Sequence, residues 1–296
     1  MSQPIVSVVL PTYNNEATVG RALASILLQE GCDFELVAVD DCSTDRTPEI
    51  LAAFAAHDSR MRVVRTPANS GEGFSRTFGI RQASGKFVAA QDGDDISLPG
   101  RLRQQCEGLL AQPDIDWLAT WAYTMTPAGQ LVNEVKTSVR ADQIRAKLID
   151  GQMCVVGASM MVRRDRVLDC GGYRSVPTPD FDLARRFVCR YAVAALPAYL
   201  YAYVPASAAN QPLRYRANMR LFLAQYRDAG GRDATPRFWL RLVWTGLQGY
   251  VPFVYPVTRG IRKALSRARP APRPGGYEAW LSRLQQFEHD VMGSMD

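Results

Sequence analysis

The first ninety residues alternate apolar runs with segments of helical length, and this alternation constrains the fold more than any other feature of the sequence. Continuous apolar runs are typical of strands buried on both faces of a parallel sheet. Strands that alternate with helices form right-handed βαβ units, so the sequence predicts an α/β fold with an open, mostly parallel sheet. The expected strands are Ile5–Leu10, Phe34–Val39, Met61–Arg65 and Lys86–Ala90, and the expected helices are Ala17–Gln29, Pro48–Ala56 and Gly73–Ala83.

After Asp95 the regular alternation ends. The uncharged run Tyr191–Gln211 approaches membrane-spanning length, but it contains Pro197 and Pro205 and lacks the ~20 strongly apolar residues that a span requires. We therefore expect two short strands within it. The expected helices are Leu98–Leu110, Phe181–Arg190 and Tyr277–Val291, and the expected strands are Asp116–Tyr123, Val156–Val162, Ala192–Leu196 and Ala198–Val204, with a hairpin turn at Pro127–Gly129.

The net charge of +6 is concentrated in the last third of the chain. Thirteen Lys and Arg residues but only two Asp residues lie between Pro212 and Pro274, so this stretch carries +11 and the rest of the chain −5. We divide the chain accordingly into an α/β domain, residues 1–210, and a helical, basic C-terminal region, residues 211–296.

Aromatic, aliphatic and basic residues are interleaved in this C-terminal region, for example in Phe238–Trp244 and Arg259–Lys263. The mixture is typical of a helix lying in a membrane interface with its cations on anionic headgroups. We expect peripheral membrane contact through residues 212–273; the alternative is a helical pair packed on the domain with its arginines in solvent. No nucleic-acid partner is expected, because no recognised binding module accompanies the charge.

Cysteine and histidine usage bounds the class of protein. The six cysteines form no Cys-X-X-Cys pair and there are only two histidines, so neither a zinc site nor a disulfide framework is expected. No signal peptide is recognised, because Met1–Pro4 leads directly into the first strand. These features predict a cytoplasmic protein, held at the inner face of the cell membrane if the membrane contact exists.

Polar and acidic residues follow three of the expected strands. Pro11-Thr12-Tyr13-Asn14 ends the first, Asp40-Asp41 the second and Asp92-Gly93-Asp94-Asp95 the fourth. Ligands bind at the carboxyl ends of strands in open α/β sheets, so these residues are expected to meet there. An Asp-Gly-Asp turn can aim two carboxylates at one hard cation, Mg²⁺ or Mn²⁺, which in turn bridges diphosphate oxygens. A solvated acidic turn is the simpler explanation for one such motif, but not for three acidic strand ends together.

The ordered motifs PTYN, VDDCSTD, SGEGFSRTFGI, GKFVAAQDGDD and DFDLARR resemble those of family-2 glycosyltransferases with the GT-A fold, over about residues 5–205. The resemblance implies that a nucleoside diphosphate sugar, usually a UDP-sugar, binds at the strand ends. By this resemblance, the residues at the first strand end line the pocket for the base and ribose (Pro11, Thr12, Tyr13 and Asn14). Asp41 would accept the imide proton of uracil, and Arg76 would lie near the nucleotide.

The same resemblance assigns the chemistry to two acidic segments. Asp92 would lie at the ribose or bind the metal, and Asp94 would bind the metal. Gly93 would lie at the nucleotide, and Asp95 would orient the two carboxylates. Asp180 aligns with the base that deprotonates the acceptor hydroxyl, and its place at a helix start also suits a carboxylate N-cap. Asp182 is a second candidate for the base. Attack opposite the diphosphate would invert the anomeric centre.

Some positions depart from the family pattern. Pro179 replaces a glutamate, Thr77 follows Arg76 where an asparagine is usual, and Tyr201–Pro205 contains no histidine for the metal. The QxxRW signature of processive synthases is also absent. We therefore expect a metal-dependent enzyme that adds a single sugar to a glycan or lipid-linked hydroxyl in envelope polysaccharide biosynthesis.

Three alternative functions differ from this one in the residues that they require. A catalytically silent nucleotide-sugar-binding scaffold stays open because of the departures at Pro179 and in Tyr201–Pro205. A sugar-nucleotide pyrophosphorylase is disfavoured because its glycine-rich loop is missing after the first strand. A phosphatase with an aspartyl nucleophile is disfavoured because Asp41–Thr44 lacks the second aspartate of Asp-X-Asp-X-Thr.

Overall fold

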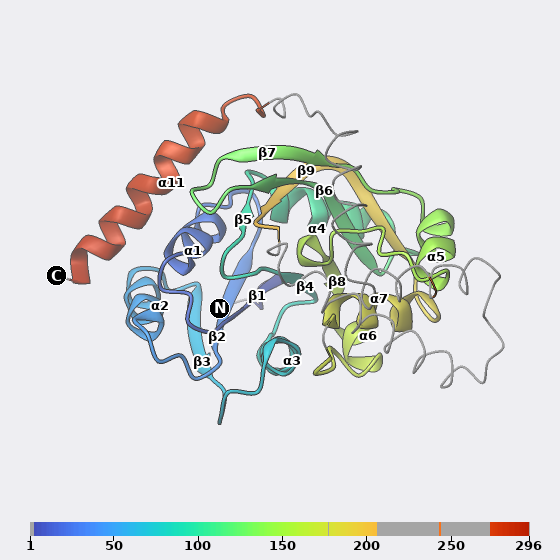
Figure 1. The fold of residues 1–296 in the computed structure, drawn as a ribbon, viewed down its shortest axis with the longest axis horizontal. Coiled ribbons are helices and arrows are strands. Elements are labelled where there is room, and N and C mark those ends of the chain that lie inside the picture. Colours follow the sequence, from blue (N-terminus) through green and yellow to red (C-terminus); the bar gives the residue numbers. More distant parts are fainter. Residues whose placement is uncertain (1–2, 177, 206–242, 244–272, 296) are drawn as a thin grey trace.

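The computed structural model describes residues 3–176, 178–205, 243 and 273–295, and in this part of the chain helices flank a curled sheet (Figure 1). The strands are β1 (Val6–Thr12), β2 (Phe34–Asp40), β3 (Met61–Arg65), β4 (Phe87–Ala90), β5 (Ile96–Ser97), β6 (Trp117–Met125), β7 (Leu131–Val135), β8 (Met161–Arg163) and β9 (Val193–Tyr203). The helices are α1 (Val19–Leu27), α2 (Thr47–His57), α3 (Glu72–Gln82), α4 (Arg101–Ala111), α5 (Ala141–Ile149), α6 (Arg164–Asp169), α7 (Pro179–Val188) and α11 (Tyr277–Met292), with 3-10 turns η1 (Gly157–Ser159) and η3 (Gly293–Met295).

The strand order within the described residues is β3-β2-β1-β4-β8-β6-β9-β5, with β7 paired to β6. Strands β3, β2, β1 and β4 are parallel, which confirms the sheet predicted for the first ninety residues. The chain leaves β1 towards β2 and β3 and returns to β4 on the other side of β1. This reversal creates a switch point between the carboxyl ends of β1 and β4, where doubly wound sheets bind their ligands.

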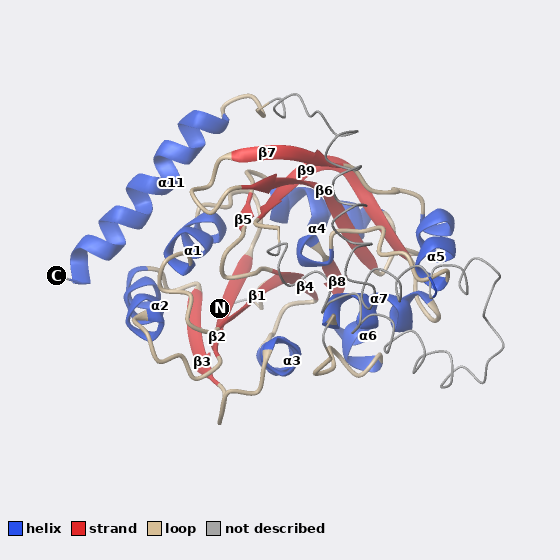
Figure 2. Ribbon diagram, viewed as in Figure 1, coloured by secondary structure: helices blue, strands red, loops and turns tan. Residues whose placement is uncertain are grey.

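Each face of the sheet packs against its own set of helices (Figure 2). One core joins α1, α2, α4 and α11 to the sheet, and the other joins α3, α5, α6 and α7 to the opposite face. All seven residues of β1 are buried, as its apolar run predicts. Burying one Val or Leu side chain contributes about 1.5–3 kcal/mol, so this doubly covered strand anchors the switch point in the core.

The second half of the sheet differs in detail from the sequence-based prediction. The prediction of two short strands around Pro197 is wrong, because β9 is one strand that runs parallel to β6. The pairing shifts register between Leu196 and Tyr199, so Pro197, which has no N–H to donate, lies at a bulge. Of the strand expected at 156–162 only the end is extended, since η1 occupies Gly157–Ser159. Helices α5 and α6 and strands β5 and β7 were not predicted.

The end of the chain returns to the first helices of the α/β domain. Helix α11 packs on α1 and α2, with Leu284 and Val291 buried and the Phe287 ring against Phe54. The Tyr277 hydroxyl donates to the Gly129 carbonyl at 3.1 Å. The domain boundary predicted at residue 210 and the membrane contact predicted for residues 212–273 lie outside the described residues, apart from the isolated residue 243 and the final position 273. None of the helices described is long and apolar enough to cross a bilayer.

Candidate functional site

A cavity of about 420 Å³, here called the first cavity, opens at the switch point between β1 and β4. It unites three separate strand ends and the start of α3, as the sequence predicted for the acidic segments. Eight of the nine predicted nucleotide- and metal-binding residues line it; Asn14 does not. The full lining is Pro11, Thr12, Tyr13, Asn15, Asp41, Asn69, Gly71, Glu72, Ser75, Arg76, Asp92, Gly93 and Asp94.

Asp41 is fixed in its ionised form by donors from the loop before α3. Its carboxylate accepts hydrogen bonds from the Thr66 hydroxyl at 2.7 Å, the Ser70 N–H at 3.0 Å and the Gly71 N–H at 2.7 Å. Burial acts to raise the pKa of Asp41, but these hydrogen bonds outweigh it and hold the pKa below its ordinary value. A buried carboxylate of this kind is a fixed acceptor for one further N–H.

The loop after β1 is braced by its two asparagines. Asn14 adopts a positive φ of 51°, and its side-chain oxygen accepts from the Thr44 N–H, which turns it away from the first cavity. Asn15 accepts from the Thr12 hydroxyl and the Tyr13 N–H. Asn14 therefore holds the loop, while Tyr13 presents a ring that is 46% exposed and can stack on a planar ligand.

Arg76 is a buried cation between two acids. Its guanidinium pairs with Asp92 at 2.6 Å and Glu72 at 2.7 Å, and lies over the Tyr173 ring. Although burial acts to lower it, the negative charges of Asp92 and Glu72 raise the pKa of Arg76. Its Nε and Nη1 are buried with no hydrogen-bond acceptor in the part of the chain described, and Arg76 is one of the residues that line the first cavity.

The acidic turn after β4 concentrates negative charge. Burial, and then the charge of Asp92, raise the pKa of Asp94. Burial and the charges of Asp92 and Asp94 raise the pKa of Asp95 well above its ordinary value. Groups that repel one another in this way are stabilised by a cation or by added donors.

Behind the turn, a buried arginine ties it to the sheet. Arg101 donates to the Gln91 side chain and to the Ala90 carbonyl at 3.0 and 2.6 Å, and stacks on the Tyr201 ring. The Tyr201 hydroxyl in turn accepts from the Asp92 N–H at 3.3 Å. Arg101 and Tyr201 thus fix the backbone from which the Asp92 and Asp94 carboxylates project.

The donor set of the acidic turn suits a hard divalent cation, because carboxylate oxygens are the ligands that Mg²⁺ and Mn²⁺ prefer. The protein does not complete such a site by itself. Within the described ranges, no three His, Cys, Asp or Glu side chains gather closely enough to hold a metal ion. A cation at Asp92 and Asp94 would take its remaining ligands from water or from the oxygens of a bound phosphate.

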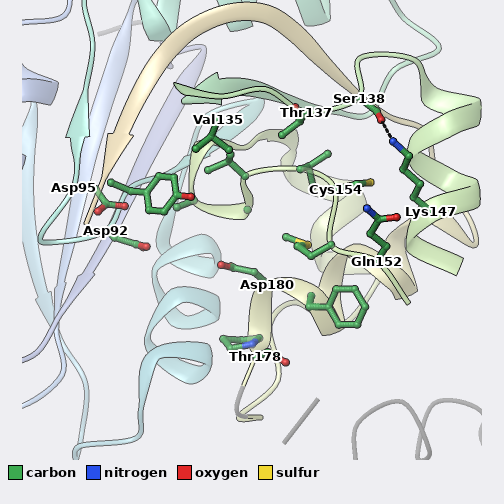
Figure 3. A pocket seen from close by; sticks show the side chains of 18 of the residues that line it. Asp92, Asp95, Val135, Thr137, Ser138, Lys147, Gln152, Cys154, Thr178 and Asp180 are labelled. Atoms are coloured by element: carbon green, nitrogen blue, oxygen red, sulfur yellow. Dashed lines mark hydrogen bonds between the residues drawn. The ribbon is translucent and has the colours of Figure 1, made fainter. Parts of the chain in front are cut away.

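A larger second cavity, of about 760 Å³, adjoins the first. The two share Glu72, Asp92 and Asp94, so the acidic turn forms the partition between them. Figure 3 shows Asp180 at the start of α7 with its carboxylate turned towards the side on which Asp92 and Asp95 lie. The other lining residues are Asp95, Val135, Lys136, Thr137, Ser138, Lys147, Gly151, Gln152, Met153, Cys154, Val155, Val156, Gly157, Ala158, Thr178, Pro179, Phe181, Tyr203 and Val204.

The two candidates for the general base occupy different surroundings. Asp180 lines the second cavity beside Gly157, where a Cβ would come within 2.8 Å of the Asp180 Cβ and Cγ. Asp182 is fully buried and pairs with Arg186 at 2.6 Å, away from either cavity lining. The geometry therefore favours Asp180 as the carboxylate that can meet a ligand.

Several site residues were not predicted from the sequence. Glu72 opens α3 one turn before Arg76 and could have been found from the helix period, because residues i and i+4 share one face of a helix. Tyr201 reaches the acidic turn from β9, more than a hundred residues further along the chain, and Arg101 reaches it from the start of the following helix, α4. Gly157 matters only through its contact with Asp180, and no local pattern signals that contact.

Comparison with known sequences agrees with the family resemblance of the motifs. Residues 7–172 match the protein family described as Glycosyl transferase family 2. An uncharacterized glycosyltransferase of Methanocaldococcus jannaschii is 33% identical over 165 residues, which covers 55% of this chain and 57% of the relative. The match thus spans little more than half the length of that relative.

Solved structures share the fold. Residues 1–349 of S. aureus TarS in complex with UDP-GlcNAc align with a TM-score of 0.60 and 22% identity, covering 74% of this chain and 66% of that chain. A mannosyltransferase, PcManGT from Pyrobaculum calidifontis, in complex with GDP-Man and Mn²⁺, aligns with a TM-score of 0.61 and 18% identity, covering 100% and 88%. At these identities the likeness concerns the fold.

Proposed function

The chain belongs to glycosyltransferase family 2 and has the GT-A fold, and from that premise we propose that it transfers a sugar from a UDP-sugar to an acceptor hydroxyl with inversion. The first cavity would hold the donor and the second the acceptor. The observation that carries this proposal is the partition itself, because Glu72, Asp92 and Asp94 line both cavities. A sugar transferred at that partition would leave a nucleotide in the first cavity and join an acceptor hydroxyl in the second.

Donor binding would follow from the fixed groups of the first cavity. The exposed Tyr13 ring would stack on the base, and Asp41 would accept the imide N–H of uracil. The free N–H groups of Arg76 would donate to diphosphate oxygens, where charge-assisted bonds are strong. The base preference is part of the proposal, since the two structural neighbours hold different nucleotides, UDP-GlcNAc and GDP-Man.

Asp180 would act as the general base on the acceptor hydroxyl. Its carboxylate points towards the partition, so a hydroxyl between it and the anomeric carbon would lose its proton as the oxygen attacks. Attack from the second cavity is opposite to a diphosphate held in the first, which inverts the anomeric centre. Gly157 allows Asp180 this position, because any side chain there would collide with it.

A divalent cation would be held by Asp92 and Asp94 together with diphosphate oxygens and water. When bound, it would supply positive charge to the departing diphosphate. Burial and the charges of neighbouring carboxylates raise the pKa values of Asp94 and Asp95, and a cation would offset the repulsion, which supports this assignment.

The acceptor would be a glycan or lipid-linked sugar of envelope polysaccharide biosynthesis, reached from the inner face of the membrane. Contact of residues 212–273 with anionic lipid stays a prediction. A flotation assay with anionic and neutral vesicles tests it, and recovery of the protein only at the bottom of the gradient with both would contradict it.

Nucleotide titration with turnover tests the proposal. We expect UDP to bind more tightly than GDP, and binding to weaken on addition of EDTA and to recover with Mn²⁺ or Mg²⁺. A UDP-sugar and an accepted glycan should release UDP, and NMR of the product should report the inverted anomer. Nucleotide binding without UDP release across a broad acceptor panel would instead support the silent nucleotide-sugar-binding protein.

A further inference from the structure

The two ends of the second cavity carry opposite charge. Carboxylates of Asp92, Asp94 and Asp95 line the end at the partition. In Figure 3, Lys147 lies at the other end, with Asp180 between it and Asp92. An acceptor that places a hydroxyl beside Asp180 would therefore extend its remaining groups towards a cation.

Lys147 is a half-buried cation without a carboxylate partner in the part of the chain described. Its ammonium donates to the Ser138 hydroxyl at 2.5 Å, and this single bond leaves two further N–H donors. The other lysine of the cavity differs. Lys136 pairs with Glu134 at 3.3 Å, and its side chain is 59% exposed. An anion stabilises a partly buried charge more than a solvent-exposed one. Lys147 is therefore the cation at this end of the cavity that would bind an anionic ligand group.

The surroundings of Lys147 supply further donors for an oxyanion. Ser138 contacts the ammonium, and Gln152 lies beside it in Figure 3. Hydroxyl and amide groups can donate to phosphate oxygens, and lysine binds phosphate as a point charge. The carboxylates at the partition would repel an anionic group, which fixes the direction in which an anionic acceptor enters.

We propose that Lys147 and Ser138 form a subsite for a phosphate group of the acceptor, with the acceptor hydroxyl lying beside Asp180. The inference rests on the proposed function and adds the chemical class of the acceptor. The phosphate can belong to a lipid diphosphate that carries the sugar or to a phosphodiester in a polyol phosphate chain.

Calorimetric titration with two probes tests the subsite. Geranyl diphosphate stands for the lipid diphosphate and a glycerol phosphate trimer for the polyol phosphate chain, each added after UDP and Mg²⁺ have filled the first cavity. We expect at least one probe to bind, and Lys147→Met to weaken it about 10-fold, as for the loss of a charge-assisted hydrogen bond. Lys147→Arg should retain most of the affinity.

Lys86→Met is the matched control, because it removes the same charge from an exposed site that lines neither cavity. Equal binding by wild type and Lys147→Met, an equal loss in Lys86→Met, or no binding of either probe to wild type would overturn the subsite. Binding of geranyl diphosphate alone identifies the lipid source, and binding of the trimer alone identifies the polyol source.

A separate UDP titration keeps this result distinct from the proposed function. Lys147→Met should bind UDP as wild type does, because Lys147 does not line the first cavity. Failure of wild type to bind UDP or GDP would contradict the proposed function, and the probe titrations repeated without nucleotide would still decide the subsite.

Discussion

The two cavities are built in different ways. The first is lined by residues that follow parallel strands, and its Asp41 carboxylate is held by backbone N–H groups. The second is lined by residues of α5, α7 and η1, by the ends of β7 and β9 and by the loops near them, and Asp180 lies beside Gly157. If the first cavity holds the donor and the second the acceptor, as we propose, donor recognition is part of the fold, whereas acceptor recognition depends on side chains brought together from distant segments.

The largest expected effect is on turnover alone, with donor binding unchanged. Asp180→Asn should lower turnover by about 10²–10⁴-fold, the usual contribution of a general base, with UDP affinity unchanged. Steady-state kinetics and UDP titration measure both quantities. Asp182→Asn is the contrasting variant, since Asp182 is paired with Arg186 in the core and its loss should lower stability instead. Normal turnover in Asp180→Asn would show that the base lies elsewhere.

A second substitution tests whether the two cavities are independent, because Arg101 supports both of them. Arg101 donates to the Ala90 carbonyl at the end of β4, just before the acidic turn that both cavities share, and to the carbonyl of Ala158, which lines the second cavity. Arg101→Met would leave several buried acceptors unpaired, and we expect it to lower the free energy of unfolding by about 3 kcal/mol. Urea unfolding measures this. Arg103→Met, on the exposed side of the same helix, should change it by less than about 0.5 kcal/mol.

Gly157→Ala sharpens the comparison by disturbing only the second cavity. The added methyl would come within 2.8 Å of Asp180 and displace its carboxylate. A shift of about 1 Å in a catalytic group can cost about 10²-fold in rate, so turnover should fall by that order while UDP affinity holds. Gly275→Ala, whose Cβ would meet nothing within 4 Å, controls for the substitution itself. A turnover within twofold of wild type would separate Gly157 from the positioning of Asp180.

The smallest expected effect is on stability and comes from Glu35, in strand β2 of the sheet that carries the first cavity. Burial acts to raise the pKa of Glu35, but hydrogen bonds from Ser7, Ser84 and Arg62 lower it from 4.5 to about 2. The folded pKa lies below the unfolded one, so the ionised carboxylate stabilises the fold above pH 4.5, and this stability is lost as pH falls towards 2.

With a discount for partial exposure, ionised Glu35 contributes about 1–2 kcal/mol to the free energy of unfolding. Glu35→Gln should remove that part of the pH dependence in urea unfolding measured between pH 6 and pH 3. An unchanged slope would contradict the assignment.

The same difference explains what the sequence could predict. Parallel strands with covered faces require continuous apolar runs, so β1 to β4 and the residues at their carboxyl ends could be located from pattern alone. The resemblance to the family added the roles proposed for Asp41 and Asp94.

Sequence patterns failed where tertiary contacts decide the structure. Pro197 was interpreted as a strand break, but the β6–β9 pairing accommodates it in a bulge. The family resemblance places Asn14 in the base and ribose pocket, but its side chain braces the neighbouring loop through Thr44 and does not line the first cavity. No periodic pattern marks Gly157, because its contact with Asp180 joins two segments that are separate in the sequence. Lys147 is likewise marked by no pattern, because the second cavity that it lines is assembled from several segments.

Hydrogen–deuterium exchange with UDP and Mn²⁺ tests the division into donor and acceptor cavities most directly. UDP without its sugar should slow exchange in residues 69–76, where Ser70 and Gly71 donate to Asp41. Residues 151–157 and 178–181, which line only the second cavity, should exchange as before. Slowed exchange in those two segments with none in residues 69–76 would contradict the account.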